Sequence, residues 1–228
     1  MRPLGNTLIT GGASGLGAAV AQAVASEGGR PLILDRAQPQ TDADFERADL
    51  ADRVATEDAV ERLAQRAGGL HAVVNAAGID ACGALDKVDA DDWERVIRVN
   101  LLGTASVVRA ALPHLEASHG TVVDCASTLG VRAVPDATAY CASKAGVMGF
   151  TRALAAETAG RIGVTLLVPG GMDTAFFDDR PDAYRPGPDA RLNPPEYVAR
   201  AVVFALGQPL GCEVRELVVC PSEETSWP

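Results

Sequence analysis

A tyrosine and a lysine stand four residues apart in the stretch AYCASKAG, as Tyr140 and Lys144. Residues four apart share one face of a helix, so the lysine ammonium can lie near the phenol. A free phenol has a pKa of about 10 and is a poor base at neutral pH, whereas a nearby positive charge favours the phenolate and lowers that pKa. The pair alone also fits an ordinary helix that carries a phenol and a charge on one face. Supported by the rest of the chain, it predicts a general acid–base group.

A glycine-rich turn, LITGGASGLGAAVA, is the second stretch that could do chemistry. Between an expected strand and an expected helix, Gly11 and Gly15 allow a tight turn and a close approach to a pyrophosphate, and Gly17 allows close packing of helix on strand. The start of the helix offers free N–H groups and a positive dipole end to that anion. The spacing is G-x-x-x-G-x-G rather than G-x-G-x-x-G, so a glycine-rich turn without a ligand remains an alternative.

Asp35 ends the next expected strand, PLILDR, and indicates which dinucleotide would bind. A carboxylate at this position accepts hydrogen bonds from ribose hydroxyls and repels a 2′-phosphate, which favours NAD over NADP. Arg36 follows directly, and its guanidinium could pair with a phosphate, so NADP stays open. The glycine turn holds no Lys or Arg that would assist, since Ser14 precedes Gly15.

Short apolar runs that alternate with helical patterns must position these groups. The expected strands are Leu8–Thr10, Leu32–Asp35, Glu46–Leu50, Ala72–Ala76, Thr121–Ala126, Val164–Val168 and Arg215–Val219. The helical patterns occupy Gly15–Gly28, Glu57–Ala67, Trp93–Leu115, Ala139–Ala159 and Glu196–Leu206. This alternation is typical of βαβ units and predicts an α/β fold: a Rossmann-like, doubly wound, seven-stranded parallel sheet with helices on both faces. One domain is expected over residues 1–228, with a proline-rich surface excursion at about 175–195.

Composition and charge exclude several classes of protein. The formal net charge of −10 argues against nucleic-acid binding, which needs a surface rich in lysine and arginine. No run of about eighteen apolar residues suggests a membrane span, and the start MRPLGNTLIT lacks a cleavable signal pattern. The five cysteines are scattered and never form C-x-x-C, so reduced thiols in the cytoplasm are expected and a metal site is not.

Seven motifs resemble, in this order, those of the short-chain dehydrogenase/reductase family in its compact single-domain form. They are TGGASGLG (Thr10–Gly17), ADL with Asp49 and Leu50, NAAG (Asn75–Gly78), VN with Asn100, DCAS with Ser127, YCASK with Tyr140 and Lys144, and PGGMDT (Pro169–Thr174). Each stands on the strand end or helix where the family has it, and the resemblance covers nearly the whole chain.

The resemblance implies a role for each of four catalytic residues. Tyr140 would take the proton from an alcohol or give one to a carbonyl, and Ser127 would hydrogen-bond the same substrate oxygen. Lys144 would lower the tyrosine pKa and bind the ribose hydroxyls of the nicotinamide half. Asn100 would hold a water that links Lys144 to solvent. Hydride transfer itself is the chemistry of the cofactor.

The same resemblance implies two sets of binding residues. Those for the cofactor are Gly11, Ser14, Gly15, Leu16, Gly17, Asp35, Arg36, Asp49, Leu50, Asn75, Ala76, Ala77, Gly78, Tyr140, Lys144, Pro169, Gly170, Met172 and Thr174. Those for the substrate are Ser127, Leu129, Tyr140, Gly171, Phe176 and Phe177. The apolar character of the second set favours a hydrophobic or medium-sized substrate, such as a hydroxyacyl compound, a cyclic alcohol or a polyketide-like ketone. Because the excursion is short for the family, an open and tolerant pocket is expected.

The resulting hypothesis is an NAD-dependent oxidoreductase that interconverts a secondary alcohol and a ketone. An NADPH-linked ketoreductase of a biosynthetic pathway differs only in cofactor and direction. A non-catalytic dinucleotide sensor fits less well, because Ser127, Tyr140 and Lys144 are all present. A sugar-nucleotide epimerase or dehydratase of the family's longer branch would need a C-terminal substrate domain. The family implies a homotetramer or homodimer, formed through the long helices and the last helix and strand, and the tail PSEETSWP is expected to touch a neighbouring subunit.

Overall fold

The computed structural model of the protein describes residues 1–227 and contains one sheet of seven parallel strands. These are β1 (Asn6–Thr10), β2 (Arg30–Asp35), β3 (Asp44–Arg47), β4 (Ala72–Asn75), β5 (Thr121–Cys125), β6 (Gly163–Pro169) and β7 (Glu216–Val219). Their order across the sheet is β3-β2-β1-β4-β5-β6-β7, so the chain winds outward from β1 in one direction and from β4 in the other. The predicted doubly wound, Rossmann-like fold is confirmed, and its switch point between β1 and β4 is where such sheets bind ligands.

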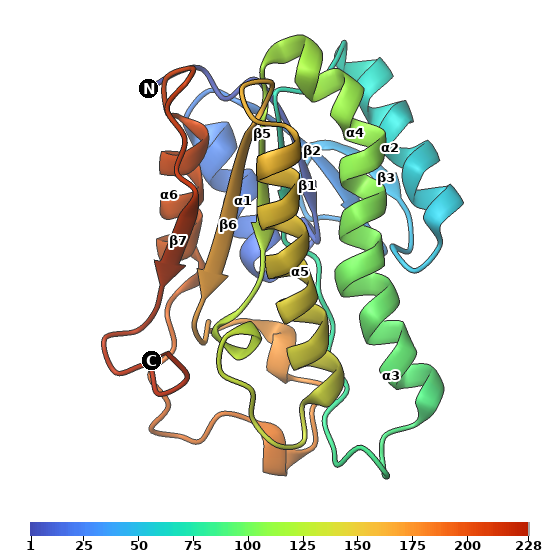
Figure 1. The fold of residues 1–228 in the computed structure, drawn as a ribbon, viewed down its shortest axis with the longest axis vertical. Coiled ribbons are helices and arrows are strands. Elements are labelled where there is room, and N and C mark those ends of the chain that lie inside the picture. The colour runs from blue at the N-terminus through green and yellow to red at the C-terminus, as the bar shows by residue number, and fades with distance from the viewer. Residues whose placement is uncertain (228) are drawn as a thin grey trace.

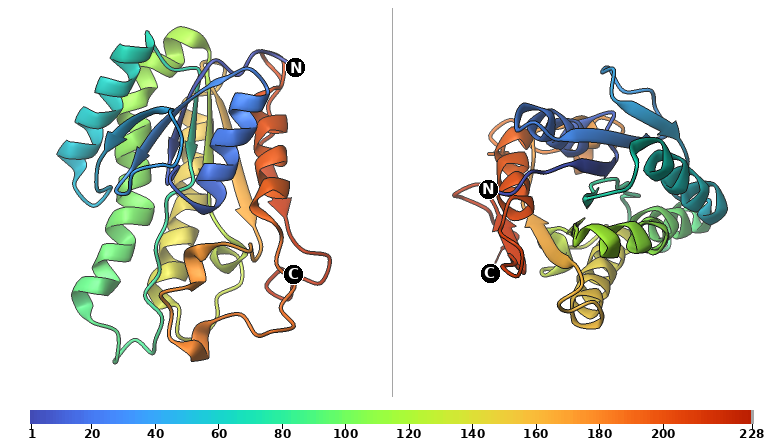
Figure 2. Two further views of the ribbon diagram at one scale, coloured as in Figure 1. Left: turned by 180° about the vertical axis from the view of Figure 1, so that it is seen from behind. Right: turned by 90° about the horizontal axis from the view of Figure 1, so that it is seen from above.

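Helices cover both faces of this sheet. They are α1 (Gly15–Ser26), α2 (Arg53–Ala67), α3 (Ala90–Ile97), α4 (Thr104–Ser118), α5 (Thr138–Glu157) and α6 (Pro195–Leu206). Helices α1 and α6 lie side by side on one face, and α2, α4 and α5 cover the other (Figures 1 and 2). Because successive side chains of a strand point to opposite faces, Leu8 packs in the cluster that includes α2 and α4, whereas Ile9 packs in the cluster that includes α1 and α6.

The edge strand β3 begins two residues and ends three residues before the predicted strand Glu46–Leu50. After β3 ends at Arg47, the Ala48 N–H still donates to the Asp35 carbonyl at 3.1 Å, and the chain then turns toward α2. Helix α2 begins four residues earlier than predicted, because Asp52 caps it by accepting a hydrogen bond from the Ala55 N–H at 3.0 Å.

The predicted helix Trp93–Leu115 is part of a longer helical segment from Ala90 to Ser118, with a π-helical turn, Arg98–Gly103, between α3 and α4. Asp89 caps its start by accepting from the Asp91 N–H at 2.8 Å. Within residues 1–227 this is the one helix whose length and composition would suffice to cross a membrane, and half of its most apolar window is buried inside the protein. Packing against α2 and the sheet accounts for the buried half.

Two irregular segments lie beyond the carboxyl ends of the strands, at the bottom of Figure 1. The excursion contains two short 3-10 turns, Ala175–Phe177 and Asp182–Tyr184, and no long strand, as its prolines predicted. The tail after β7 returns to the same end, where Arg132 donates to the Thr225 carbonyl at 2.8 Å. The tail therefore contacts its own chain at the end of the sheet where the predicted site residues gather.

Candidate active site

A cleft of about 1320 Å³ opens at the carboxyl ends of the strands. The predicted residues that line it are Gly11, Ser14, Gly15, Leu16, Gly17, Arg36, Ala76, Ala77, Gly78, Ser127, Leu129, Tyr140, Lys144, Pro169, Gly170, Gly171, Met172, Thr174, Phe176 and Phe177. The predicted residues that do not line it are Asp35, Asp49, Leu50, Asn75 and Asn100. The fold thus brings together residues from most of the chain, and the five exceptions stand behind or beside the cleft.

The glycine turn after β1 has the shape that a pyrophosphate requires. Helix α1 begins at Gly15, its cap residue Ser14 makes no side-chain cap hydrogen bond, and its first turn has no acidic residue. The N–H groups of this turn are therefore available to an anion. A Cβ at Gly11 would lie 2.9 Å from backbone atoms of Ala77, and a Cβ at Gly17 would overlap the carbonyl of Gly11. Only glycine fits here, and the exposed backbone fits the phosphates of a dinucleotide.

Asp35 braces this turn from the end of β2. Its two carboxylate oxygens accept hydrogen bonds from the N–H groups of Ala13 and Ala37, both at 2.9 Å. Each oxygen keeps a further lone pair that a ribose hydroxyl could use. Arg36 is exposed and lines the cleft directly. The acidic and basic groups that bear on cofactor choice are therefore both at the adenosine end of the site.

Asp49 and Leu50 are occupied by other contacts. Arg95 donates to the Asp49 carboxylate at 2.7 Å, and the Ala51 N–H donates to its other oxygen at 3.0 Å. Burial raises the pKa of Asp49, but these two hydrogen bonds and the positive charge of Arg95 outweigh it and hold the pKa below its ordinary value. Leu50 is buried in the core against Gly103. A contact with adenine through these residues remains a prediction.

Tyr140 and Lys144 lie on the first turns of α5, and Ser127 follows β5. Lys144 is 4 % exposed, and its Nζ lies 5.7 Å from the centroid of the Tyr140 ring. The ammonium donates a hydrogen bond to the Cys125 carbonyl at 2.8 Å. The Ser127 hydroxyl accepts from the Leu129 N–H at 3.2 Å, so its own proton is left for an oxygen in the cleft, that of Tyr140 or of a substrate.

The protein's own groups hold the pKa of Tyr140 above its ordinary value, and the lowering expected from Lys144 together with an oxidised nicotinamide stays a prediction. Burial raises this pKa, the nearby Cys125 raises it further, and hydrogen bonding with Ser127 acts in the opposite sense. The reason is that the phenol is partly buried beside Phe176, while the lysine ammonium is held by a backbone carbonyl. Burial likewise lowers the pKa of Lys144. An acidic phenol therefore requires a second positive charge in the cleft, such as that of an oxidised nicotinamide.

Asn100 lies within the π-helical turn and is 1 % exposed. Its side chain accepts from the Ile79 N–H at 2.8 Å and donates to the Ile79 carbonyl at 2.9 Å and the Ser143 hydroxyl at 3.0 Å. A Cβ at Gly78 would lie 3.4 Å from Lys144 Nζ and 3.5 Å from Asn100 Oδ1. The polar ends of Lys144 and Asn100 therefore both lie next to Gly78. The π turn thus places Asn100 beside the lysine, and its water relay remains a prediction.

A buried carboxylate behind the lysine was not singled out from the sequence. Asp124 on β5 is fully buried and accepts hydrogen bonds from Asn75 Nδ2 at 2.8 Å and the Thr151 hydroxyl at 3.0 Å. Burial raises its pKa to about 6, although both hydrogen bonds and the charge of Lys144 lower it. This contact also explains why Asn75 does not face the cleft. The signal was an aspartate inside the otherwise apolar strand TVVDC, since carboxylates are almost never fully buried without partners.

Two further contacts of charged groups near the cleft were also missed. Arg180 in the excursion pairs with Asp80, which follows the NAAG motif, at 2.7 Å. Glu224 in the tail accepts a hydrogen bond from the Gly171 N–H at 3.0 Å, in the segment predicted to cradle the nicotinamide. Both contacts join residues far apart in the chain, so spacing could not reveal them.

The sequence model of the short chain dehydrogenase family matches residues 6–185. The chain belongs to that family. It is therefore an oxidoreductase that acts on CH–OH groups and binds a nicotinamide dinucleotide. The 3-oxoacyl-(acyl-carrier-protein) reductase FabG of Thermotoga maritima is 33% identical over 216 residues, which cover 86% of this chain and 88% of that protein. An uncharacterized oxidoreductase of Staphylococcus aureus (strain MW2) is 32% identical, over 94% of this chain and 96% of its own.

Solved structures of this short-chain dehydrogenase family agree with the fold. A short chain dehydrogenase from Burkholderia cenocepacia in complex with NADP superposes with a TM-score of 0.83 at 29% identity, covering 95% of this chain and 96% of that one. The ligand-free aldohexose dehydrogenase of Thermoplasma acidophilum has a TM-score of 0.84 at 24% identity, over 95% and 92% of the two chains, and supports the fold alone.

Proposed function

We propose that the protein interconverts a secondary alcohol and a ketone with NAD as its cofactor. One observation carries this proposal: Tyr140, Ser127 and Lys144 line the same cleft as the glycine turn at the start of α1. An acid–base group, an oxyanion donor and an ammonium then stand along the site where the dinucleotide fits.

The roles of the side chains follow from their contacts. Tyr140 exchanges a proton with the substrate oxygen, and Ser127 donates its free hydroxyl proton to the same oxygen. Lys144 uses one N–H for the Cys125 carbonyl and keeps two for ribose hydroxyls. The nicotinamide supplies the hydride acceptor or donor when bound. The protein thus holds the transferred proton on Tyr140, orients the substrate oxygen through Ser127 and keeps the reacting carbon in a partly enclosed site.

The preference for NAD rests on Asp35, whose carboxylate at the end of β2 would repel a 2′-phosphate. A specific observation favours the alternative, an NADPH-linked ketoreductase. Both oxygens of Asp35 already accept backbone hydrogen bonds, whereas Arg36 lines the cleft. The Burkholderia relative is a complex with NADP, and the Thermotoga relative is named a reductase.

Fluorescence titration of NADH and NADPH against the wild type and two variants decides the cofactor. We expect tighter binding of NADH, a loss of that preference in Asp35→Ala, and unchanged NADH affinity in Arg36→Ala. Tighter binding of NADPH by the wild type, lost selectively in Arg36→Ala, would establish the alternative instead.

The substrate proposed for this site is apolar or of medium size. Phe176, Phe177 and Leu129 line the cleft beyond the catalytic residues, and the rings of Phe176 and Tyr140 lie 5.7 Å apart. A panel of cyclic alcohols, hydroxyacyl thioesters and free sugars, followed through the absorbance of the reduced nicotinamide, tests this class. We expect the highest kcat/KM for an uncharged apolar alcohol; turnover of free sugars alone would contradict it.

We further propose that residues 1–228 form one catalytic domain that assembles as a homotetramer or homodimer. Exposed apolar side chains on the long helix, α6 and β7 support this: Leu102 (55%), Phe204 (53%) and Val218 (40%). The five free cysteines support a reducing, cytoplasmic compartment. Sedimentation of a species of 23.6 kDa, the mass of one chain, would contradict the assembly.

A further inference from the structure

Asp80 and Arg180 form the most buried ion pair among residues 1–227, with side chains 6% and 17% exposed. They stand 100 residues apart in the chain. The loop after β4 holds the Asp80 carboxylate in place, because the Ala81 N–H donates to one oxygen at 2.7 Å and the Cys82 thiol donates to the other at 3.3 Å. The excursion is therefore attached to a pre-positioned carboxylate at the mouth of the site.

Arg180 also organises the aromatic wall of the cleft. Its guanidinium carbon lies 4.9 Å from the ring centroid of Phe176 and 4.7 Å from that of Phe177. The Phe176 ring in turn lies 5.7 Å from the ring of Tyr140. Arg180 Nε is buried without a hydrogen-bond partner among the described residues. A buried N–H without a partner costs free energy, so other contacts must hold the Arg180 guanidinium in place. Those contacts are the ion pair with Asp80 and the rings of Phe176 and Phe177.

We propose that Asp80 and Arg180, here called the clamp, dock residues 174–185 over Tyr140 and fix Phe176 as the apolar wall of the substrate pocket. This inference rests on the proposed function and narrows its substrate class. The opposite charges of Asp80 and Arg180 compensate each other, and the rings of Phe176 and Phe177 pack on Arg180. The pocket therefore selects uncharged substrates with an apolar group beside the reacting carbon. Asp80 and Arg180 are positioning residues, since neither exchanges a proton with the substrate. The expected open and tolerant pocket is replaced by one with a fixed wall.

The clamp also balances the electrostatic potential at the catalytic phenol. The charged and titratable groups that face Tyr140 are Lys144 from its own helix, Cys125 from β5, Asp80 from the loop after β4 and Arg180 from the excursion. The charge of Asp80 raises the pKa of Tyr140 and the charge of Arg180 lowers it. Removing one member leaves the other uncompensated. The two single removals must therefore move the pKa of Tyr140 in opposite directions.

The test uses the full chain with its cofactor and three variants: Asp80→Asn, Arg180→Gln and the double variant. For an uncharged apolar ketone we expect each single change to raise KM roughly 10- to 100-fold, with a smaller effect on kcat, because the wall is misplaced. The double variant should lose no more than either single one, since the two residues act as a pair. It also leaves no unpaired buried charge, so we expect it to fold even if a single variant does not.

The pH profile of kcat supplies a readout that a merely structural role would not move. The limb that reports Tyr140 should shift to lower pH in Asp80→Asn and to higher pH in Arg180→Gln. Arg185→Gln is the matched control, because Arg185 donates to backbone carbonyls of the same excursion and, among the described residues, forms an ion pair only with the exposed Asp182. Additive losses in the double variant, coincident pH profiles, or an equal effect of Arg185→Gln would overturn the clamp.

A measurement without turnover separates the clamp from the proposed function. Trypsin can cut the excursion after Arg191, which all variants retain, but not after Arg185, because Pro186 follows it. We expect faster cleavage there in Asp80→Asn than in the wild type, because the excursion is released. If the wild type binds NADH but turns over no alcohol or ketone, the proposed function fails. Faster cleavage in Asp80→Asn would still support the docking, and an unchanged cleavage rate would overturn it.

Discussion

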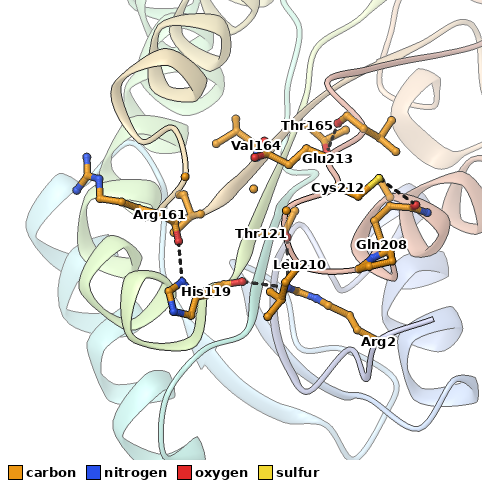
Figure 3. Close-up of a pocket in the computed structure, with 17 residues that line it drawn as sticks. Arg2, His119, Thr121, Arg161, Val164, Thr165, Gln208, Leu210, Cys212 and Glu213 are labelled. Atoms are coloured by element: carbon orange, nitrogen blue, oxygen red, sulfur yellow. Dashed lines mark hydrogen bonds between the residues drawn. The ribbon is translucent and has the colours of Figure 1, made fainter.

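Two cavities at opposite ends of the sheet differ in what their polar groups are free to do. One is the cleft at the carboxyl ends of the strands. The other, of about 260 Å³, lies at the amino ends and is lined by residues including Arg2, His119, Arg161 and Glu213 (Figure 3). Both hold charged side chains, so the presence of charge does not tell which one is the site of chemistry.

The polar groups of the amino-end cavity are committed to the fold. Arg2 donates to the His119 carbonyl at 2.9 Å, as Figure 3 shows, and Glu213 accepts from the Val164 N–H at 3.3 Å. Arg161 pairs with Glu116. In the cleft, Lys144 keeps N–H donors that no group among residues 1–227 uses, and the Ser127 hydroxyl donates only to an oxygen in the cleft itself. Unused hydrogen-bonding capacity, held in place by a rigid fold, is what distinguishes the active site.

Among the changes that compare the two ends of the sheet, the largest effect should follow from Ser127→Ala, which removes a donor from the cleft. We expect kcat to fall roughly 10²- to 10³-fold, as for the loss of one oxyanion donor, with cofactor affinity unchanged. Ser118→Ala is the matched control at the amino end, where the hydroxyl donates to the Leu70 carbonyl at 2.7 Å. It should cost about 1 kcal/mol of stability and leave kcat intact. An equal loss of kcat in both would erase the distinction between the two ends.

Asp124→Asn should alter stability with pH, because Asp124 is a buried carboxylate at the carboxyl end. Its pKa is about 6 in the folded protein against 3.8 for the free side chain. The folded state therefore binds this proton more tightly than the unfolded state does. The protonated carboxyl contributes its whole stabilising effect below about pH 4, and this effect is lost as the pH rises through about 6. Relative to the wild type, the free energy of unfolding of the variant should rise by up to about 3 kcal/mol between pH 4 and pH 7.

Urea unfolding at a series of pH values measures this difference. The exposed Asp42→Asn variant serves as the control and should stay within about 0.5 kcal/mol of the wild type throughout. A flat difference between Asp124→Asn and the wild type would mean that Asp124 carries its charge at no cost, and that the pairing with Asn75 and Thr151 fully compensates its burial.

The smallest effect should come from Arg161→Ala in the amino-end cavity. The pair with Glu116 is half-exposed, so the change should cost less than about 1 kcal/mol and leave kcat and KM untouched. Thermal unfolding and steady-state kinetics measure both. A loss of turnover here would show that the two ends are coupled.

The sequence predicted the sheet and most of the site because both depend on local patterns. Apolar runs indicated the seven strands. The glycine turn and the Tyr140–Lys144 spacing each depend on residues that are close together in the sequence. The clamp of Asp80 and Arg180 could not be read in this way, since it joins positions 100 residues apart. The sequence could not show that burial raises the pKa of Tyr140, nor that the Cys125 carbonyl holds Lys144, because both are tertiary features.

The central claim is that the Tyr140 phenol transfers a proton beside a bound nicotinamide. Comparing Tyr140→Phe with the wild type, by turnover of the preferred alcohol and by NADH fluorescence titration of the same samples, tests it most directly. We predict a fall in kcat of roughly 10²- to 10⁴-fold with NADH affinity preserved, because phenylalanine keeps the ring and removes only the proton donor. Full turnover in Tyr140→Phe, or a wild type that binds no dinucleotide, would contradict the account.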